Sequence, residues 1–491
     1  MMSIKKSGGN TLEKLEKKLE GKITLILFIT MVTIFTIPSI VYFVSNKTVY
    51  DFNALWTFLA REPIFQNEPK INAILFGSMF TSIFLLYLAV VKENKKIFKN
   101  NKEIFAIITI TSMLFLLIIP YTSTDVYSYI GNGWSTAHYG ENPYYTSIGE
   151  IQEKNSAEDP MFHKVSGNWL YEKVIYGPLW TIICTVLAKL SFGNIDLALL
   201  IFKVSNLCMH ILNCFLIYKI TRKKSFVLLY GLNPFILFEA IANVHNDIFI
   251  VSFILLAIYC IKQKKKIYMA VASIAMATAI KYMAILILPF ILIYALRDKE
   301  VKERIKYCIL CGLEYIAILV MIYLIYMRDF QVLAGILIQQ GKYRNSIFYM
   351  ICLLVRYDLE KVIIIQKLSL GIFALYYIYV VVKLLLQKNI EFKEAIKKYQ
   401  IILFIFIFIL ITNFNPWYLM WLFPTMFWLD KTLLKNIILL SYTSQIANIF
   451  SFALCSEYHM LSIVYVTIMI LSVAIANLVM KFNEKKMIER K

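Results

Sequence analysis

An aspartate followed by aromatic and polar side chains is the first part of this sequence that could carry chemistry. The stretch DVYSYIGNGWSTAHYGENPYY (125–145) begins with Asp125, whose carboxylate could take a proton from a hydroxyl group. Aromatic rings stack on sugar faces, and we expect this stretch to bind a sugar through six side chains: Tyr127, Tyr129, Trp134, His138, Glu141 and Tyr144. Aspartate is also among the best helix N-cap residues, which remains an alternative role for Asp125.

A second polar group interrupts the apolar stretch NPFILFEAIANVHNDIFIVSF (233–253), where His245, Asn246 and Asp247 would form the external end of a helical hairpin. Ionisable side chains at a membrane boundary are costly unless they are solvated or paired. We therefore expect these three residues to hold substrate hydroxyl groups, although Asn246 could equally serve the turn itself.

A single lysine, Lys281, interrupts the apolar stretch SIAMATAIKYMAILILPF (273–290) at another expected external turn. Its ammonium group is a compact charge that suits phosphate, and we expect Lys281 to bind the phosphate of a lipid. The alternative is that the side chain only extends to the external surface. Lys342 and Arg344 are expected on the same side, where they could add positive charge or could simply be solvated.

A pair of aromatic residues, Trp417 and Tyr418, follows Asn415 and Pro416 at one more expected external turn. They could contact a sugar or belong to an aromatic belt at the membrane interface. No spacing of Cys, His, Asp or Glu predicts a metal site, and we expect neither a metal nor a cofactor. The acid, the His/Asp pair, the lysine and the aromatic rings are expected to converge on one face.

The composition excludes an ordinary soluble protein. The 491 residues are 59% hydrophobic and 17% charged, with a mean hydropathy of +0.66. Apolar runs such as IILFIFIFILIT (401–412) could contribute to crossing a bilayer core of about 30 Å, which predicts a polytopic membrane protein. The net charge of +20 comes from short basic clusters between apolar segments, which indicates membrane topology, and we expect no nucleic-acid partner.

The charge clusters favour an all-α chain of about fourteen transmembrane helices with both termini in the cytoplasm. The stretch 175–192 is expected to enter the outer leaflet and return, because crossing would leave the basic segment after residue 218 outside. The predicted organisation has five parts: a cytoplasmic segment (1–22), two N-terminal spans with loops (23–103), a core (104–297) with a long external loop (121–195) containing juxtamembrane helices, a transmembrane module (298–480) and a cytoplasmic tail (481–491).

Five blocks of this sequence resemble those of the GT-C superfamily of polyprenyl-phosphate-sugar-dependent glycosyltransferases, and are most similar to bacterial membrane α-1,6-mannosyltransferases. The blocks occur in the family's order: DVYSYIGNGWSTAHYGENPYY (125–145), YGPLW (176–180), NPFILFEAIANVHND (233–247), IKYMAILILP (280–289) and NPWYLMWLFP (415–424). The chain has no phosphate-binding GxxxxGK[ST] loop, so a nucleotide-driven reaction has no obvious cytoplasmic site.

The resemblance implies a GT-C fold in the cell membrane and an active site on the external face. It also implies transfer of a hexose such as mannose, with inversion, from a polyprenyl-phosphate donor to an external glycan or lipid-linked acceptor. Asp125 matches the family's general base, and Lys281 matches a residue near the donor phosphate. Two alternatives remain, a transporter or flippase of lipid-linked sugar and a phosphotransferase or oligosaccharide ligase.

Overall fold

The computed structural model describes most of the chain, namely residues 7–46, 69–120, 122–155, 158–165, 167–264, 266–335, 341–387, 389–454 and 458–488. The ends of the two predicted cytoplasmic segments and most of the predicted external segment 46–70 lie outside these residues. The described residues form helices and no extended strand. A single isolated backbone bridge joins Arg344 to Asn413.

The first helix is longer than the sequence analysis predicts. Helix α1 spans Ser7–Asn46, so the polar segment expected before residue 23 continues directly into the apolar one. Leucine, glutamate and lysine dominate TLEKLEKKLEGK (11–22), and these residues are strong helix formers. In the part of the chain that the structure describes, three helices follow before residue 121: α3 (Pro69–Lys92), α4 (Asn94–Ile97) and α5 (Asn101–Leu116).

The segment predicted to be a long external loop (121–195) contains short helices that pack on one another, and these are called the external-loop helices below. They are α6 (Asp125–Tyr139), α7 (Ile148–Asn155), α8 (Gly167–Tyr171) and α9 (Pro178–Lys189). At Gly133, a Cβ atom would lie 2.3 Å from the carbonyl oxygen of Cys184, so glycine permits close contact between α6 and α9. Helix α9 has 12 residues and is about 18 Å long, too short to cross a bilayer core of about 30 Å.

The central helices run through several breaks. They are α10 (Ile195–Thr221), α11 (Lys224–Gly231), α12 (Pro234–Ile236), η1 (Leu237–Ala242), α13 (Asp247–Tyr259), η2 (Cys260–Lys264), α14 (Ile267–Thr278), η3 (Tyr282–Ile287) and α15 (Leu288–Leu296). A bend of 43° separates α11 from the segment that begins at Pro234, a residue that cannot donate a backbone hydrogen bond. The π-helical η1 then ends directly before the polar turn 243–246.

The described residues of the C-terminal part form four long helices and several short ones. They are α16 (Val301–Tyr323), η4 (Phe330–Leu333), α18 (Ile347–Leu354), α19 (Leu359–Leu385), α20 (Phe392–Ile405), η5 (Phe406–Leu410), η6 (Pro416–Trp428), α21 (Lys431–Leu454) and α22 (Tyr458–Ile488). Helix η6 is a 3₁₀ helix that packs against both α13 and α21.

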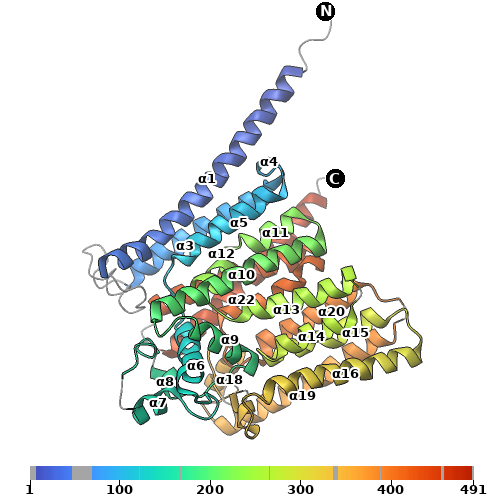
Figure 1. The fold of residues 1–491 in the computed structure, drawn as a ribbon. Helices are drawn as coiled ribbons and strands as arrows, with labels where there is room; N and C mark the ends of the chain where they lie inside the picture. Colours follow the sequence, from blue (N-terminus) through green and yellow to red (C-terminus); the bar gives the residue numbers. More distant parts are fainter. Residues whose placement is uncertain are drawn as a thin grey trace, which may run out of the picture.

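The architecture is that of an all-helical polytopic membrane protein. Among the described residues, five helices are long and apolar enough to cross a membrane (α1, α3, α10, α16 and α19), or six if α11 and its bent continuation count as one. The figure of fourteen spans stays a prediction. The beginning of α1 and the end of α22 lie at the upper right of Figure 1, and α6, α7 and α8 lie at the opposite, lower-left end.

Candidate active site

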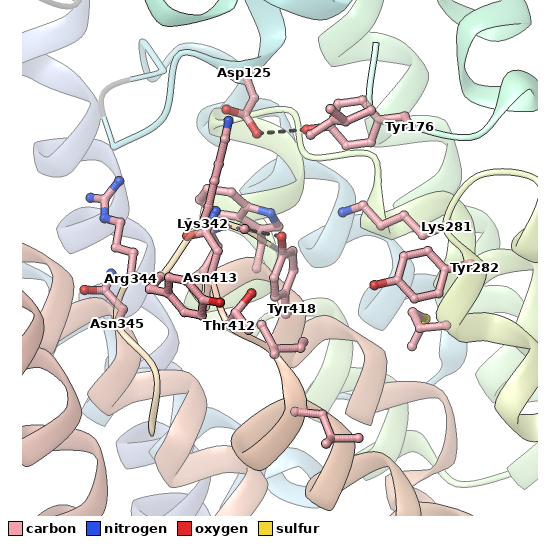
Figure 2. A pocket seen from close by; sticks show the side chains of 18 of the residues that line it. Asp125, Tyr176, Lys281, Tyr282, Lys342, Arg344, Asn345, Thr412, Asn413 and Tyr418 are labelled. Atoms are coloured by element: carbon pink, nitrogen blue, oxygen red, sulfur yellow. Dashed lines mark hydrogen bonds between the residues drawn. The ribbon is translucent and has the colours of Figure 1, made fainter. Parts of the chain in front are cut away.

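A large cavity lies beside the external-loop helices. Its volume is about 1210 Å³, and its walls come from the start of α6, the segment before α9, the turn before η3, the segment 341–345 and the segment 410–421. Figure 2 shows Asp125 and Tyr176 at the top of this view, Lys281 and Tyr282 on one side, and Arg344 and Asn345 on the other. Six predicted site residues line the cavity: Asp125, Lys281, Lys342, Arg344, Trp417 and Tyr418.

The first of these, Asp125, is the first residue of α6 and is 7% exposed. Thr124 occupies the N-cap position, so the capping role considered for Asp125 is not the one that the structure gives it. The Asp125 carboxylate instead accepts a hydrogen bond from the Tyr176 hydroxyl, at 3.2 Å from Oδ2. A carboxylate held at the wall of a cavity in this way can accept a proton from a bound hydroxyl group.

The lysine that interrupts the apolar stretch, Lys281, precedes η3 and is held by a protein carboxylate. Its Nζ donates hydrogen bonds to both oxygens of Asp247, at 2.7 and 2.8 Å. The ammonium group also lies 5.1 Å from the ring centre of Tyr418 and 5.6 Å from that of Tyr176, within cation–π range. The Lys281 ammonium group, which was expected to bind a lipid phosphate or to extend to the surface, therefore has an internal partner, Asp247, that fixes its position.

The hairpin residues His245, Asn246 and Asp247 are fully buried and do not line the cavity. Helix η6 packs over this end of the hairpin, so the three residues lie behind the cavity wall, and their contact with substrate hydroxyl groups stays a prediction. The indole nitrogen of Trp421 donates to Asp247 Oδ1 at 2.6 Å, and the ring of Trp417 stacks on His245 with ring centres 3.7 Å apart. These contacts make His245 and Asp247 a support behind the cavity wall.

A buried carboxylate, Glu239, lies behind the same wall. Its Oε2 is 3.2 Å from His245 Nε2, while His245 Nδ1 is 3.9 Å from Asp125 Oδ2. Gln445 and Asn243 each donate a hydrogen bond to Glu239. The imidazole thus lies between one carboxylate at the cavity and another that is fully buried.

The cations of the segment 341–345 are also held by protein groups. Lys342 Nζ lies 2.6 Å from Glu172 Oε1 in an ion pair whose side chains remain about one-third exposed. The backbone of Arg344 pairs with a distant segment, since its amide donates to Thr412 at 2.9 Å and its carbonyl accepts from Phe414 at 2.9 Å. This pairing places Arg344 at the cavity beside Asn413 (Figure 2).

The six α6-region residues expected to bind sugar do not line the cavity. Three of them make defined contacts elsewhere: Trp134 donates to Asp159 at 2.7 Å, the Tyr144 hydroxyl donates to the Tyr176 carbonyl at 2.7 Å, and Glu141 accepts from Lys154 at 2.7 Å. The Lys154 contact lowers the pKa of Glu141. His138 stacks on Trp134, and Tyr127 and Tyr129 are almost fully buried. These residues build the external-loop unit that carries Asp125.

Several cavity residues were not predicted as site residues: Trp169, Glu172, Tyr176, Tyr282, Asn345, Thr412, Asn413 and Trp421. The block YGPLW (176–180) contains Tyr176, and the block NPWYLMWLFP (415–424) contains Trp421. These two residues could therefore have been found from the sequence blocks. The polar residues of 411–415 reach the cavity through pairing with a segment some seventy residues earlier, which no local pattern indicates. Within the described residues, no group of three or more His, Cys, Asp or Glu side chains could hold a metal ion.

Comparisons with known proteins point in one direction. The sequence model described as "Alpha-(1->6)-mannopyranosyltransferase, N-terminal domain" matches residues 50–297, which include Asp125, Tyr176 and Lys281. The alpha-(1->6)-mannopyranosyltransferase A of Mycobacterium tuberculosis (strain ATCC 25618 / H37Rv) is 26% identical over 200 residues, which cover 39% of this chain and 36% of that protein. No solved structure matches the chain. Because the family model matches just over half of the chain, the protein belongs to the alpha-(1->6)-mannopyranosyltransferase family.

Proposed function

We propose that this protein is a membrane glycosyltransferase of the GT-C fold that moves a hexose, mannose, from a polyprenyl-phosphate donor to a hydroxyl group of an external glycan or lipid-linked acceptor. The observation that carries the proposal is that Asp125 and Lys281 line one cavity although they are far apart in the sequence. A proton acceptor and a cation at one site are what transfer from a phosphate leaving group requires.

The reaction forms one bond and breaks one bond at the anomeric carbon. The acceptor oxygen attacks this carbon from the side opposite the phosphate, while the Asp125 carboxylate takes the hydroxyl proton. The bond between the anomeric carbon and the phosphate oxygen breaks, and the lipid phosphate leaves with the electron pair. The configuration of the sugar is therefore inverted, and no oxidant, reductant or cofactor is needed.

Charge at the cavity supports an anionic leaving group. The described residues that line it include four basic side chains, Lys281, Lys342, Arg344 and Lys367, against two acidic ones, Asp125 and Glu172. A lysine ammonium has three N–H donors, and two of those of Lys281 go to Asp247. The third is left for a phosphate oxygen, where it offsets the charge that develops as the sugar leaves.

One wall of the cavity supports a lipid-linked substrate. It consists of apolar or aromatic side chains from η3, α19 and η5: Tyr282, Met283, Ile363, Leu370, Phe406 and Leu410. Tyr282 and Ile363 are each 43% exposed, and Leu370 is 50% exposed. Because α19 is apolar and long enough to cross a membrane, this wall is suited to a hydrocarbon chain that continues into the bilayer. Arg344, Asn345 and Asn413, which also line the cavity, are polar and suit hydroxyl groups.

The proposal also includes the topology, with about fourteen spans, both termini in the cytoplasm and the cavity at the external face. The beginning of α1 and the end of α22 at one end of the molecule, and α6 to α8 at the other, support this arrangement (Figure 1). A donor already on the external face would then meet the acceptor there, so no cytoplasmic nucleotide site is required.

The test uses purified protein in detergent with radiolabelled polyprenyl-phosphate-mannose and extracted cell-envelope acceptors. Wild-type protein is expected to transfer label, and Asp125→Asn to lose transfer while still binding the donor. The matched control is Glu158→Gln in the same external loop, because its side chain is 93% exposed. Equal transfer by wild type and Asp125→Asn would remove Asp125 from its role. Movement of intact donor across vesicles without label transfer would favour the transporter or flippase instead.

A further inference from the structure

The hydroxyl group of Tyr176 connects two side chains of α6. It donates a hydrogen bond to Asp125 Oδ2 and accepts one from the Tyr129 hydroxyl, and each of these distances is 3.2 Å. The two tyrosine rings meet edge to face with centres 5.2 Å apart, and Tyr129 makes a similar contact with Trp180 at 5.1 Å. These ring contacts restrict the direction in which the Tyr176 hydroxyl can point.

Both phenols keep their protons at neutral pH. Burial raises the pKa of Tyr176 and of Tyr129 well above the usual value, and the nearby charge of Asp125 raises both further. An ionised carboxylate can only accept hydrogen bonds. The direction is therefore fixed: Tyr129 donates to Tyr176, and Tyr176 donates to Asp125.

The position of Tyr176 is set by backbone contacts on both sides. Its carbonyl oxygen accepts a hydrogen bond from the Tyr144 hydroxyl at 2.7 Å. The next residue, Gly177, donates its amide to the Ile280 carbonyl at 2.9 Å, directly beside Lys281. Tyr176 is thus tied to the loop that carries Asp125 and to the turn that carries Lys281.

We propose that Tyr176 is a positioning residue for Asp125, holding carboxylate oxygen Oδ2 so that Oδ1 receives the proton from the acceptor hydroxyl. Both contacts of the Asp125 carboxylate given above, to Tyr176 and to His245, involve Oδ2. This assignment rests on the proposed function of Asp125 as the base. It adds a residue that acts through Asp125 and not on the sugar itself.

Loss of the Tyr176 hydroxyl has an effect of definite sign on pH dependence. A donor to a carboxylate stabilises its charged form, so removing that donor favours the protonated form, which cannot act as a base. In a plot of kcat/KM against pH, the rise on the acidic side (the acidic limb) should therefore move to higher pH. The other ionisable groups around Asp125 remain in place: His245 with Glu239 behind it, Tyr129, Tyr418, and the pair of Lys281 with Asp247.

The experiment compares Tyr176→Phe with wild type in the transfer assay, across pH, with KM and kcat measured separately. We expect kcat to fall about tenfold or more, KM to stay within about twofold, and the acidic limb to move up by about one pH unit. Tyr171→Phe is the matched control from the same loop, because Tyr171 is 60% exposed and its hydroxyl donates to the surface residue Glu153. It should leave the rate and the limb unchanged.

A second variant keeps the test decisive if Tyr176→Phe does not fold. Tyr129→Phe removes the donor to Tyr176, and it should move the limb in the same direction by a smaller amount. An unchanged acidic limb in a folded Tyr176→Phe protein, whatever its thermal stability, overturns the positioning role. If Asp125→Asn transfers label normally, the proposed function itself fails. If Asp125→Asn is inactive and the limb of Tyr176→Phe is unmoved, only the present proposal fails.

Discussion

The amide of Gly177 donates a hydrogen bond to the carbonyl of Ile280 at 2.9 Å, and this contact joins the segment before α9 to the turn that carries Lys281. The two backbones approach so closely that a Cβ atom at residue 177 would lie 2.2 Å from the Ala279 oxygen. We therefore expect Gly177→Ala to push the two segments apart and to lower the free energy of unfolding by about 1–3 kcal/mol. Transfer activity should fall more than stability alone explains, because Tyr176 and Lys281 move relative to each other.

The matched control for this change is Gly167→Ala at the start of α8. A Cβ atom there meets nothing within 4 Å. Thermal unfolding in detergent and label transfer should therefore be close to wild type for Gly167→Ala and reduced for Gly177→Ala. Full activity of Gly177→Ala would show that the contact does not set the geometry of the site.

The pair formed by Lys281 and Asp247 gives a second prediction. Asp247 is fully buried and Lys281 is 13% exposed, so Lys281→Met leaves a buried carboxylate without its cation. We expect a loss of about 3–5 kcal/mol of stability and a loss of transfer. The double variant Asp247→Asn/Lys281→Met should recover much of the stability, because neither charge remains, but it should not recover transfer.

Thermal unfolding measures the structural role of the Lys281–Asp247 pair, and label transfer measures its role in the reaction. A double variant that is stable and inactive assigns the cation to the reaction. A double variant that transfers label as well as wild type would remove Lys281 from the reaction and leave the pair as a structural feature only.

Part of the site could be predicted because the chain is a membrane protein. A polar residue at the edge of an apolar stretch is costly, so Asp125 and Lys281 stand out from their neighbours, and both line the cavity. The six α6-region residues were assigned to sugar binding because aromatic rings stack on sugars, but the same rings are efficient packing residues, and sequence alone does not separate the two uses.

The remaining parts of the site depend on contacts between distant segments. The pair of Lys342 with Glu172 joins residues 170 positions apart, and the bond from Trp421 to Asp247 joins residues 174 apart. His245 and Asp247 were expected at the external end of a hairpin because the sequence places them between two apolar segments. It does not reveal that η6, which begins at Pro416, packs over this hairpin.

Glu141 provides a test of the sugar-binding surface that the sequence suggested. Its contact with Lys154 lies away from the cavity, so Glu141→Gln should keep kcat and KM within about twofold of wild type. The pKa of Glu141 is lowered in the folded protein, so the pair stabilises the fold above the ordinary pKa of glutamate and loses this effect as the pH falls. The side chains are 68% and 22% exposed, which limits the effect to about 1 kcal/mol or less.

The measurement for Glu141 is a set of unfolding curves at several pH values, together with kinetics at neutral pH. A small stability difference between wild type and Glu141→Gln should be present at pH 7, decline as the pH falls below the ordinary pKa of glutamate, and disappear once the pH is below the lowered pKa of the folded protein. A large rise in KM for the donor or the acceptor would contradict the structural assignment and return Glu141 to the substrate-binding residues.

The apolar wall of the cavity leads to a prediction about the donor chain. Ile363 lines the cavity from α19, whereas its neighbour Ile364 is 56% exposed and does not line it. A hydrocarbon chain along this wall would be displaced by a larger side chain at residue 363. We therefore expect Ile363→Trp to raise KM about tenfold for a long-chain polyprenyl-phosphate donor and to leave KM nearly unchanged for a short-chain donor. Ile364→Trp, at an exposed position outside the cavity lining, should change neither value. If Ile363→Trp raised KM equally for both donors, the wall would contact the sugar or phosphate and not the chain, and a different surface of the cavity would have to hold the lipid.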